Sequence, residues 1–364
     1  MKHLIIEARE SGTSTGRYVD KLVESLQVLK PGFDITVLTK PGRLKFFERI
    51  APGFKSFSSS AKEFSLSEQA TLAPQLYSLR ADLVHFTVAQ QPVLYFGKAI
   101  TTVHDLTTAR FTNPSKNPLV FKFKQLIYRF VVLWSAHKSK AVITPSEFVK
   151  QDLARFAHIN PAKIKVIHEA ADKIAEVPQP VKNVGKSDFI MYVGRPLPHK
   201  NLGRLIEAFE LLQKDYPELR LILAGKKDVL YERIEKKVSD AGIKNVIFTG
   251  FVTEGELRWL YEQASAYVFP SLSEGFGLPG LEAMAHGAPV VSSDATCLPE
   301  IYGDAAHYFD PKDPADMATK ISEVLASSAL RDQLITKGRL QAAKYSWRRM
   351  AEQTLEVYKQ VLGV

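Results

Sequence analysis

Residues 266–287 read Ala266-Tyr-Val-Phe-Pro-Ser-Leu-Ser-Glu274-Gly-Phe-Gly-Leu-Pro-Gly-Leu-Glu282-Ala-Met-Ala-His-Gly287, and this stretch decides the fold. It begins with an apolar run typical of a buried strand and ends with a helical pattern that stops at Gly287. Glu274 therefore follows the carboxyl end of a strand, and Glu282 lies in the opening turns of a helix. The glycines between them let backbone N–H groups approach an anion. Such a site can hold a phosphate between two carboxylates, each of which binds a hydroxyl-rich group. A nucleotide sugar has its parts in this order: sugar, diphosphate and ribose.

Short apolar runs with strand character alternate with helical stretches along the chain, which predicts an α/β fold with parallel sheets covered on both faces. The runs in the first half are Leu4–Ile6, Ile35–Leu38, Leu83–Phe86, Ala99–Val103, Ala141–Thr144 and Lys165–Ile167. Those in the second half are Phe189–Val193, Arg220–Ala224, Val246–Thr249, Ala266–Pro270 and Pro289–Ser292.

A polar, proline-containing segment at residues 175–186 separates two copies of this alternation. We therefore expect a first domain over 1–174, a linker over 175–186 and a second domain over 187–345. The remaining residues, 346–364, contain a helix whose apolar stripe, with Met350 and Tyr358, must be buried somewhere.

The composition is that of a globular protein: 364 residues, 45% of them apolar and 24% charged. The one cysteine, Cys297, fits a reducing compartment, and the first residues do not resemble a signal peptide. The net charge of +9 is uneven, because residues 1–185 carry 26 Lys and Arg against 15 Asp and Glu. This asymmetry indicates an anionic partner for the first half, such as an acidic membrane surface, a phosphorylated acceptor or nucleic acid, or else a solvated basic surface.

Two segments of the first half bear on membrane contact, although no apolar run is long enough to cross a bilayer. Residues 118–134 are apolar but interrupted by cations, which predicts a largely buried helix with one basic edge. Residues 43–57 interleave aromatic side chains with four cations, a composition that suits a segment lying on anionic lipid. The alternative is an ordinary amphipathic element packed on the domain. The four cations are Arg43, Lys45, Arg49 and Lys55.

The strand Phe189–Val193 is followed by residues suited to binding phosphate. Gly194 allows a tight exit from the strand, and Arg195 and Lys200 then lie at the carboxyl edge of the sheet, where open α/β folds bind ligands. Together these cations could neutralise a diphosphate without a metal, or they are two surface cations of a loop. The backbone at Val252, after Val246–Thr249, could reach a flat base.

These motifs together resemble the donor-binding half of the retaining GT-B glycosyltransferases of family 4. The resemblance is close over residues 185–362 and looser in the first half, and it includes Leu298-Pro-Glu300 and Phe309-Asp-Pro311. It implies two Rossmann-like domains facing across a cleft, with the C-terminal helix crossing back to the first domain. It also implies roles for individual residues. Arg195 and Lys200 would hold the donor diphosphate, Glu274 would face the transferred sugar, and Glu282 would bind the ribose, while the backbone of Phe276, Gly277 and Leu278 would wrap the sugar and phosphate.

Two features of the first half complete the candidate site. His104, in His104-Asp-Leu after Ala99–Val103, could bind a sugar hydroxyl or act as an acid or base, or it is a structural histidine. His-Asp-Leu resembles a motif in one branch of family 4, often mannosyl- or rhamnosyltransferases that act on lipid-linked saccharides. The loop after the first strand has Gly12 and Gly16, which suit phosphate or acceptor contact. Family members often carry adjacent glycines here, so this chain departs from the pattern.

The resulting hypothesis is a retaining glycosyltransferase of polysaccharide biosynthesis that moves a hexose from a nucleoside-diphosphate sugar to a glycan or lipid-linked saccharide. GDP-mannose is the preferred donor. We expect no cofactor and no metal, because the chain has no Asp-x-Asp sequence. The expected partners are the donor, the acceptor and an anionic membrane surface, without nucleic acid. The expected location is the cytoplasm, with peripheral contact to the inner face of the cytoplasmic membrane.

Three other functions fit a similar topology. A hydride-transferring dehydrogenase would need Gly-x-Gly-x-x-Gly after the first strand, and this chain lacks it. A nucleotide-sugar epimerase would not need a basic acceptor surface. A non-catalytic nucleotide-sugar binding protein could have lost Glu274 or Arg195, and both are present.

Overall fold

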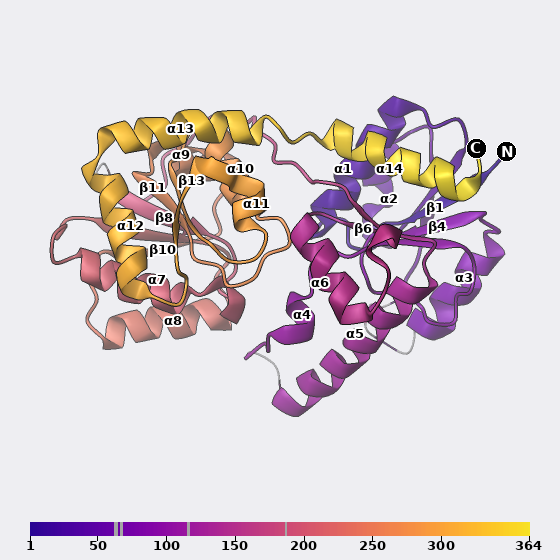
Figure 1. Cartoon of the computed structure of the whole chain (residues 1–364), viewed down its shortest axis with the longest axis horizontal. Helices are drawn as coiled ribbons and strands as arrows, with labels where there is room; N and C mark the ends of the chain where they lie inside the picture. Colours follow the sequence, from indigo (N-terminus) through magenta and orange to yellow (C-terminus); the bar gives the residue numbers. More distant parts are fainter. Residues whose placement is uncertain (62–64, 66–67, 115–116, 186–187) are drawn as a thin grey trace. The chain divides into compact units, whose positions relative to one another are not determined.

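The computed structural model describes residues 1–61, 65, 68–114, 117–185 and 188–364, which divide into two compact units (Figure 1). Unit 1 comprises Met1–Arg110, Lys122–Glu169 and Ser346–Val364. Unit 2 comprises Phe111–Phe121 and Ala170–Tyr345. The chain passes from unit 1 to unit 2 at Ala170, five residues before the expected linker. The short stretch Phe111–Phe121 also belongs to unit 2, although it lies within the first half of the sequence.

Unit 1 contains, within its described residues, a seven-stranded parallel sheet in the order β3-β2-β1-β4-β5-β6-β7. The strands are β1 (His3–Glu7), β2 (Asp34–Thr39), β3 (Lys55–Ser58), β4 (Leu83–Phe86), β5 (Ala99–Thr102), β6 (Ala141–Thr144) and β7 (Ile164–Val166). The buried strands match the expected apolar runs to within a residue or two. The edge strand β3 was not expected, because its sequence Lys-Ser-Phe-Ser is polar and none of its side chains is fully buried.

The helices of unit 1 include the last helix of the chain. They are α1 (Gly16–Leu29), α2 (Leu44–Ile50), α3 (Ala73–Ser78), α4 (Thr107–Arg110), α5 (Pro118–Lys138), α6 (Glu147–Ala157) and α14 (Trp347–Leu362). Figure 1 shows α14 beside α1. The apolar stripe of α14 is buried there, with Met350 and Tyr358 inaccessible to solvent. The Tyr358 hydroxyl lies 2.6 Å from Nδ1 of the buried His85 on β4.

Unit 2 contains, among its described residues, a six-stranded parallel sheet in the order β10-β9-β8-β11-β12-β13. The strands are β8 (Phe189–Val193), β9 (Arg220–Ala224), β10 (Val246–Gly250), β11 (Ala266–Phe269), β12 (Val290–Ser293) and β13 (Ala306–Phe309). The strand order reverses between β8 and β11, so the loops that leave these two strands diverge at the carboxyl edge. Ligands of open α/β sheets bind at this point.

The helices of unit 2 cover both faces of its sheet. They are α7 (Leu202–Leu212), α8 (Val229–Asp240), α9 (Glu254–Gln263), α10 (Leu278–Ala285), α11 (Leu298–Tyr302), α12 (Pro314–Ala326) and α13 (Ser328–Ala342). Short α10 is apolar except for Glu282, and its residues from Gly280 to Ala285 are buried. It therefore begins inside the unit, at the carboxyl edge of β11, which places its amino end at the candidate site.

The prediction that residues 118–134 form a largely buried helix is wrong. These residues form most of α5, but within that range only Val131 and Val132 are buried. Large apolar side chains of α5, such as Phe123 and Phe130, are exposed. Of the helices in the described ranges, not one combines the length and the hydropathy needed to span a bilayer.

Candidate active site

Lys200, which is expected at the donor diphosphate, and Glu274, which is expected at the transferred sugar, form an ion pair in unit 2. Lys200 ends a short helical turn (Pro198–Lys200) after β8, and Glu274 lies in the loop after β11. The Nζ atom of Lys200 lies 2.5 Å from Oε1 of Glu274, and both side chains are at least four-fifths shielded from solvent. Shielding strengthens the interaction between these charges relative to water. The pair places one cation and one anion where the strand order reverses.

The backbone around Glu274 is fixed by two residues that follow β12. The Glu274 N–H donates to Oγ1 of Thr296 (3.2 Å), and the Cys297 thiol donates to the Glu274 carbonyl oxygen (3.3 Å). Burial raises the pKa of Cys297 well above its ordinary value, and the nearby charge of Glu274 raises it further. The thiol therefore stays protonated at neutral pH and acts as a hydrogen-bond donor here.

The glycines of the turn are required by packing. Gly277 has φ +87° and precedes the first residue of α10, and its carbonyl oxygen accepts a 2.6 Å hydrogen bond from the Tyr302 hydroxyl. A Cβ atom at Gly277 or Gly280 would collide with that hydroxyl. Phe276 is buried and packs edge-to-face on Tyr345, with ring centroids 5.3 Å apart. Tyr302, which the sequence analysis missed, thus shapes the turn from α11.

Glu282 lies one turn into α10 and is nearly buried, with the Tyr261 hydroxyl 3.4 Å from Oε2. Leu278 is the first residue of the same helix. The structure therefore brings Phe276, Gly277, Leu278 and Glu282 together on one turn and the helix it starts, as the sequence predicts.

Arg195 forms an ion pair that the sequence analysis did not foresee. Its Nε atom donates to Oδ2 of Asp228 at 2.7 Å. Oδ1 of Asp228 accepts from the first backbone N–H groups of α8, so one carboxylate holds both the helix and the arginine. Burial raises the pKa of Asp228, but the hydrogen bonds from Arg195 and the backbone outweigh it, and the pKa is lowered overall. Gly194, at φ +142°, makes the exit from β8.

The segment after β10 lies farther from the pair, since β9 separates β10 from β8. Gly250 has φ +72°, Val252 is half-buried, and the Phe251 side chain between them is 77% exposed. This aromatic side chain at the carboxyl edge of the sheet presents a flat apolar surface to solvent.

His104 lies after β5 in unit 1 with both ring nitrogens occupied. Nδ1 is 2.8 Å from Oε1 of Glu169, and Nε2 is 2.9 Å from the carbonyl oxygen of Thr87. The carbonyl oxygen of Thr87 can only accept, so Nε2 donates to it, and a second proton on Nδ1 would let the ring donate to the Glu169 carboxylate as well. Burial lowers the pKa of His104, but the hydrogen bond and charge of Glu169 outweigh it and the pKa is raised. The surroundings of the ring therefore favour its protonated form. Glu169 is 65 residues away in the sequence, and no local pattern reveals it.

We expect Glu169→Gln to lower the pKa of His104, because it removes the adjacent charge while burial, which lowers the pKa, remains. An NMR titration of the imidazole protons measures this, with His307 of unit 2 as the internal control. A raised pKa also means that the protonated ring stabilises the fold below its unfolded-state pKa. This contribution is lost as the pH rises through the folded-state value. An unchanged His104 titration would contradict the assignment.

The side chain of Arg43 holds the loop between β1 and α1 in place through hydrogen bonds. Nε of Arg43 donates to Oγ of Ser11 (2.8 Å), and its guanidinium pairs with Asp20 (3.0 Å). Gly12 has φ +82° and lies against the Arg43 side chain, and a Cβ atom at Gly16 would collide with the Glu10 carbonyl oxygen. Arg43 therefore has carboxylate and hydroxyl partners inside unit 1, although the sequence groups it with the cations of a segment expected to lie on anionic lipid.

The other three cations of that segment are exposed: Lys45 and Arg49 on α2, and Lys55 at the start of β3. The guanidinium of Arg49 lies 5.7 Å from the ring centroid of Phe46. These residues stay candidates for contact with an anionic surface.

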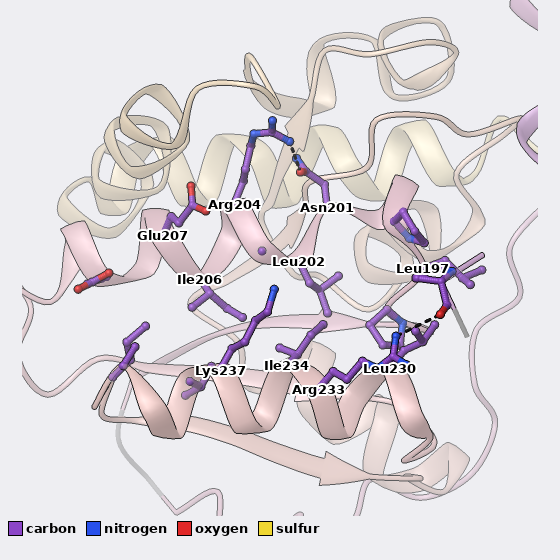
Figure 2. A pocket seen from close by; sticks show the side chains of 18 residues that line it. Leu197, Asn201, Leu202, Arg204, Ile206, Glu207, Leu230, Arg233, Ile234 and Lys237 are labelled. Carbon is purple, nitrogen blue, oxygen red and sulfur yellow. Dashed lines mark hydrogen bonds between the residues drawn. The ribbon is translucent and has the colours of Figure 1, made fainter. Parts of the chain in front are cut away.

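A pocket of about 770 Å³ opens between α7 and α8 (Figure 2). Its lining is apolar at Leu202, Ile206 and Ile234, with Lys237 rising from α8 between the helices. None of the cations and carboxylates at the carboxyl ends of β8 and β11 lines it. One end of the pocket is lined by Pro196, Leu197 and Pro198, in the loop between Arg195 and Lys200, so the pocket adjoins the candidate site without including its charged side chains.

Two family models together match most of the chain. The model described as Glycosyltransferase Family 4 matches residues 15–173, and that of Glycosyl transferases group 1 matches residues 173–341. The chain is 32% identical over 278 residues to O-antigen chain mannosyltransferase B of Escherichia coli, covering 72% of this chain and 70% of the relative. It is 27% identical over 325 residues to O-antigen chain mannosyltransferase RfbU of Salmonella typhimurium, covering 86% and 88%.

Solved structures share the fold of the whole chain. Sucrose-phosphate synthase from Thermosynechococcus elongatus has a TM-score of 0.75 at 20% identity, with all of both chains covered. Anabaena HepE in complex with UDP has a TM-score of 0.76 at 16% identity, with 99% and 100% covered. With the family models and the mannosyltransferase relatives, they lead to one conclusion: this chain belongs to the GT-B glycosyltransferases of group 1 and family 4.

Proposed function

We propose that the protein transfers mannose from GDP-mannose to a glycan or lipid-linked saccharide, with retention of configuration at the anomeric carbon. The observation that carries this proposal is the Lys200–Glu274 pair beside the turn that starts α10. The identity of the sugar rests on the relatives named as O-antigen mannosyltransferases and on the His104-Asp-Leu motif.

In this proposal the donor diphosphate is held by Arg195, Lys200 and the backbone N–H groups at Gly277. Arg195 and Lys200 each already have a carboxylate partner, Asp228 and Glu274. Those partners hold the cations in place without a ligand. The two cations supply the positive charge that a metal would otherwise provide, so we expect turnover to survive a chelator.

The chemistry exchanges one bond at the anomeric carbon for another. The bond from that carbon to the diphosphate oxygen breaks, and the diphosphate leaves with the electron pair. The acceptor oxygen forms its bond on the same face, and its proton passes to the departing diphosphate. Lys200 and the α10 amides stabilise the negative charge that develops on the leaving group. A covalent route through a carboxylate is the alternative.

In unit 1, His104 contributes a fixed positive charge held by Glu169. The loop with Gly12 and Gly16 offers its backbone to phosphate or acceptor groups. Because His104 has no unoccupied nitrogen, we assign it electrostatic stabilisation of bound oxygen atoms rather than proton abstraction.

A panel of GDP-mannose, UDP-glucose and a dTDP-sugar tests the donor. Binding to the folded state alone raises the melting temperature by mass action, about 2.7 kcal/mol of stabilisation at a hundredfold excess over Kd. We expect the largest shift with GDP-mannose, together with release of GDP in the presence of acceptor.

Each competing function gives a different result in the same assay. A shift confined to UDP- or dTDP-sugars would overturn the donor assignment. Conversion of the sugar without free nucleotide would indicate an epimerase. A shift without any turnover, across a range of acceptors, would indicate a binding protein.

A further inference from the structure

Helix α5 packs on unit 1 through one narrow face. Val132 on this face is fully buried in an apolar cluster that also contains Val142 and Leu153. Tyr128, about one turn earlier, packs against the same cluster, and Nε2 of Gln125, about two turns earlier, donates to the Thr108 carbonyl oxygen (3.0 Å). The anchored face is therefore defined by positions 125, 128 and 132.

The opposite face of α5 is apolar and exposed to solvent. Phe123, Leu126, Ile127 and Phe130 are 66%, 61%, 46% and 56% exposed. Their spacing of three, one and three residues places them on one stripe of a 3.6-residue helix. We call these four residues the α5 stripe. A soluble surface rarely keeps large apolar side chains together without a partner.

Positive charge flanks the α5 stripe on both sides. Lys122 and Lys124 are exposed, and each is one residue from Phe123, which places them about 100° to either side of it on the helix. The helix contains no Asp or Glu. The stripe thus combines aromatic and aliphatic side chains with cations at its borders.

A second segment extends this surface. Phe96, in the connection between β4 and β5, is 67% exposed, and its ring packs edge-to-face on Trp134 near the end of α5, with centroids 6.2 Å apart. Trp134 falls on the same side of the helix as Phe123 and Phe130. The exposed apolar surface therefore continues from α5 onto a loop at the sheet.

We propose that the α5 stripe docks unit 1 onto an anionic lipid bilayer. An interfacial helix lies in the plane of the headgroups with apolar side chains inserted and cations at its borders, which is the pattern of α5. The excess of Lys and Arg in residues 1–185 adds attraction to anionic headgroups. This inference rests on the proposed function and deepens it, because docking would bring unit 1 to the membrane that contains a lipid-linked acceptor. Its test does not depend on activity.

Sedimentation with vesicles tests the proposal on the full chain. We expect binding to phosphatidylglycerol-containing vesicles and much weaker binding to phosphatidylcholine alone. Phe123→Ser with Phe130→Ser should lower the vesicle partition coefficient by about tenfold or more, since each inserted aromatic contributes apolar burial. Lys122→Gln with Lys124→Gln should lower it by about tenfold, and high salt should erase that difference.

Two control variants sharpen the test. Leu340→Ser removes a side chain of unit 2 that is 65% exposed, and it should not change vesicle binding. Lys45→Gln with Arg49→Gln and Lys55→Gln removes the exposed cations of α2 and β3. A loss confined to this second variant would overturn the proposal and assign the contact to α2.

Other outcomes are equally decisive. Equal sedimentation of the Phe123→Ser, Phe130→Ser variant and the parent would overturn the proposal. A change from dimer to monomer in that variant, with vesicle binding unchanged, would show that a second copy covers the stripe. Vesicle binding by a chain that releases no GDP from GDP-mannose would leave the α5 assignment standing and overturn the proposed activity instead.

Discussion

Lys200→Met lowers turnover by about 10²–10³-fold in our expectation, the range observed when one preorganised donor to a developing negative charge is removed. Methionine keeps an apolar stem beside Phe269, whose ring centroid lies 5.7 Å from Nζ in the parent protein. The substitution therefore removes the charge with little change in packing. Release of GDP from GDP-mannose, with acceptor in excess, measures the loss.

The matched control is Lys236→Met. Lys236 is exposed on α8 and pairs with Asp240 one turn later, so its loss should change turnover by less than about twofold. Equal turnover of Lys200→Met and the parent would mean that the diphosphate binds elsewhere. A similar drop in both variants would indicate a general effect of removing lysine charge.

Asn201→Ala should destabilise the fold by about 3 kcal/mol, because Asn201 joins three segments of unit 2. Its amide nitrogen donates to the carbonyl oxygens of Pro270 (3.0 Å) and Pro311 (2.7 Å), and its Oδ1 accepts from Arg204 (2.9 Å). The residue also has left-handed backbone angles, with φ 61°, which alanine adopts at a cost. Urea denaturation measures the loss as a shift in midpoint at constant slope.

Asn201→Gly separates the two contributions. Glycine loses the same hydrogen bonds but accepts the left-handed conformation, so we expect a smaller loss of about 2 kcal/mol. Equal losses for the two variants would show that backbone conformation contributes nothing here. A midpoint unchanged in both would show that the amide does not join the segments.

The apolar runs predicted the buried strands of both sheets because a parallel strand covered on both faces must be apolar throughout. The same reasoning missed two edge strands: β3, which is of mixed polarity, and β13, whose middle residues His307 and Tyr308 are only partly buried. It also failed on α5, since a helix rich in apolar residues on all sides does not reveal which side is packed. Hydropathy reports what a segment would gain by burial, and the packing partners decide whether burial occurs.

The candidate site, too, could be predicted from the sequence only in part. Glu274 and Lys200 were predicted from the strand that precedes each of them, since the carboxyl ends of parallel strands share an edge. Their contact and the partners of Arg195 and His104 depend on residues distant in sequence. Asp228 is 33 positions from Arg195, and Glu169 is 65 from His104. Single-chain patterns carry no information about such pairs.

The position of α14 sets an order of completion during synthesis. The chain contributes the long stretch Ala170–Tyr345 to unit 2 and only then supplies the helix that places Tyr358 against His85. During translation, the sheet of unit 1 therefore lacks the helix that covers His85 until the roughly 175 residues of Ala170–Tyr345 have been synthesised. The part of the molecule encoded first is thus the last to be finished, and a nascent chain stalled before its final helix would present an open apolar flank to chaperones.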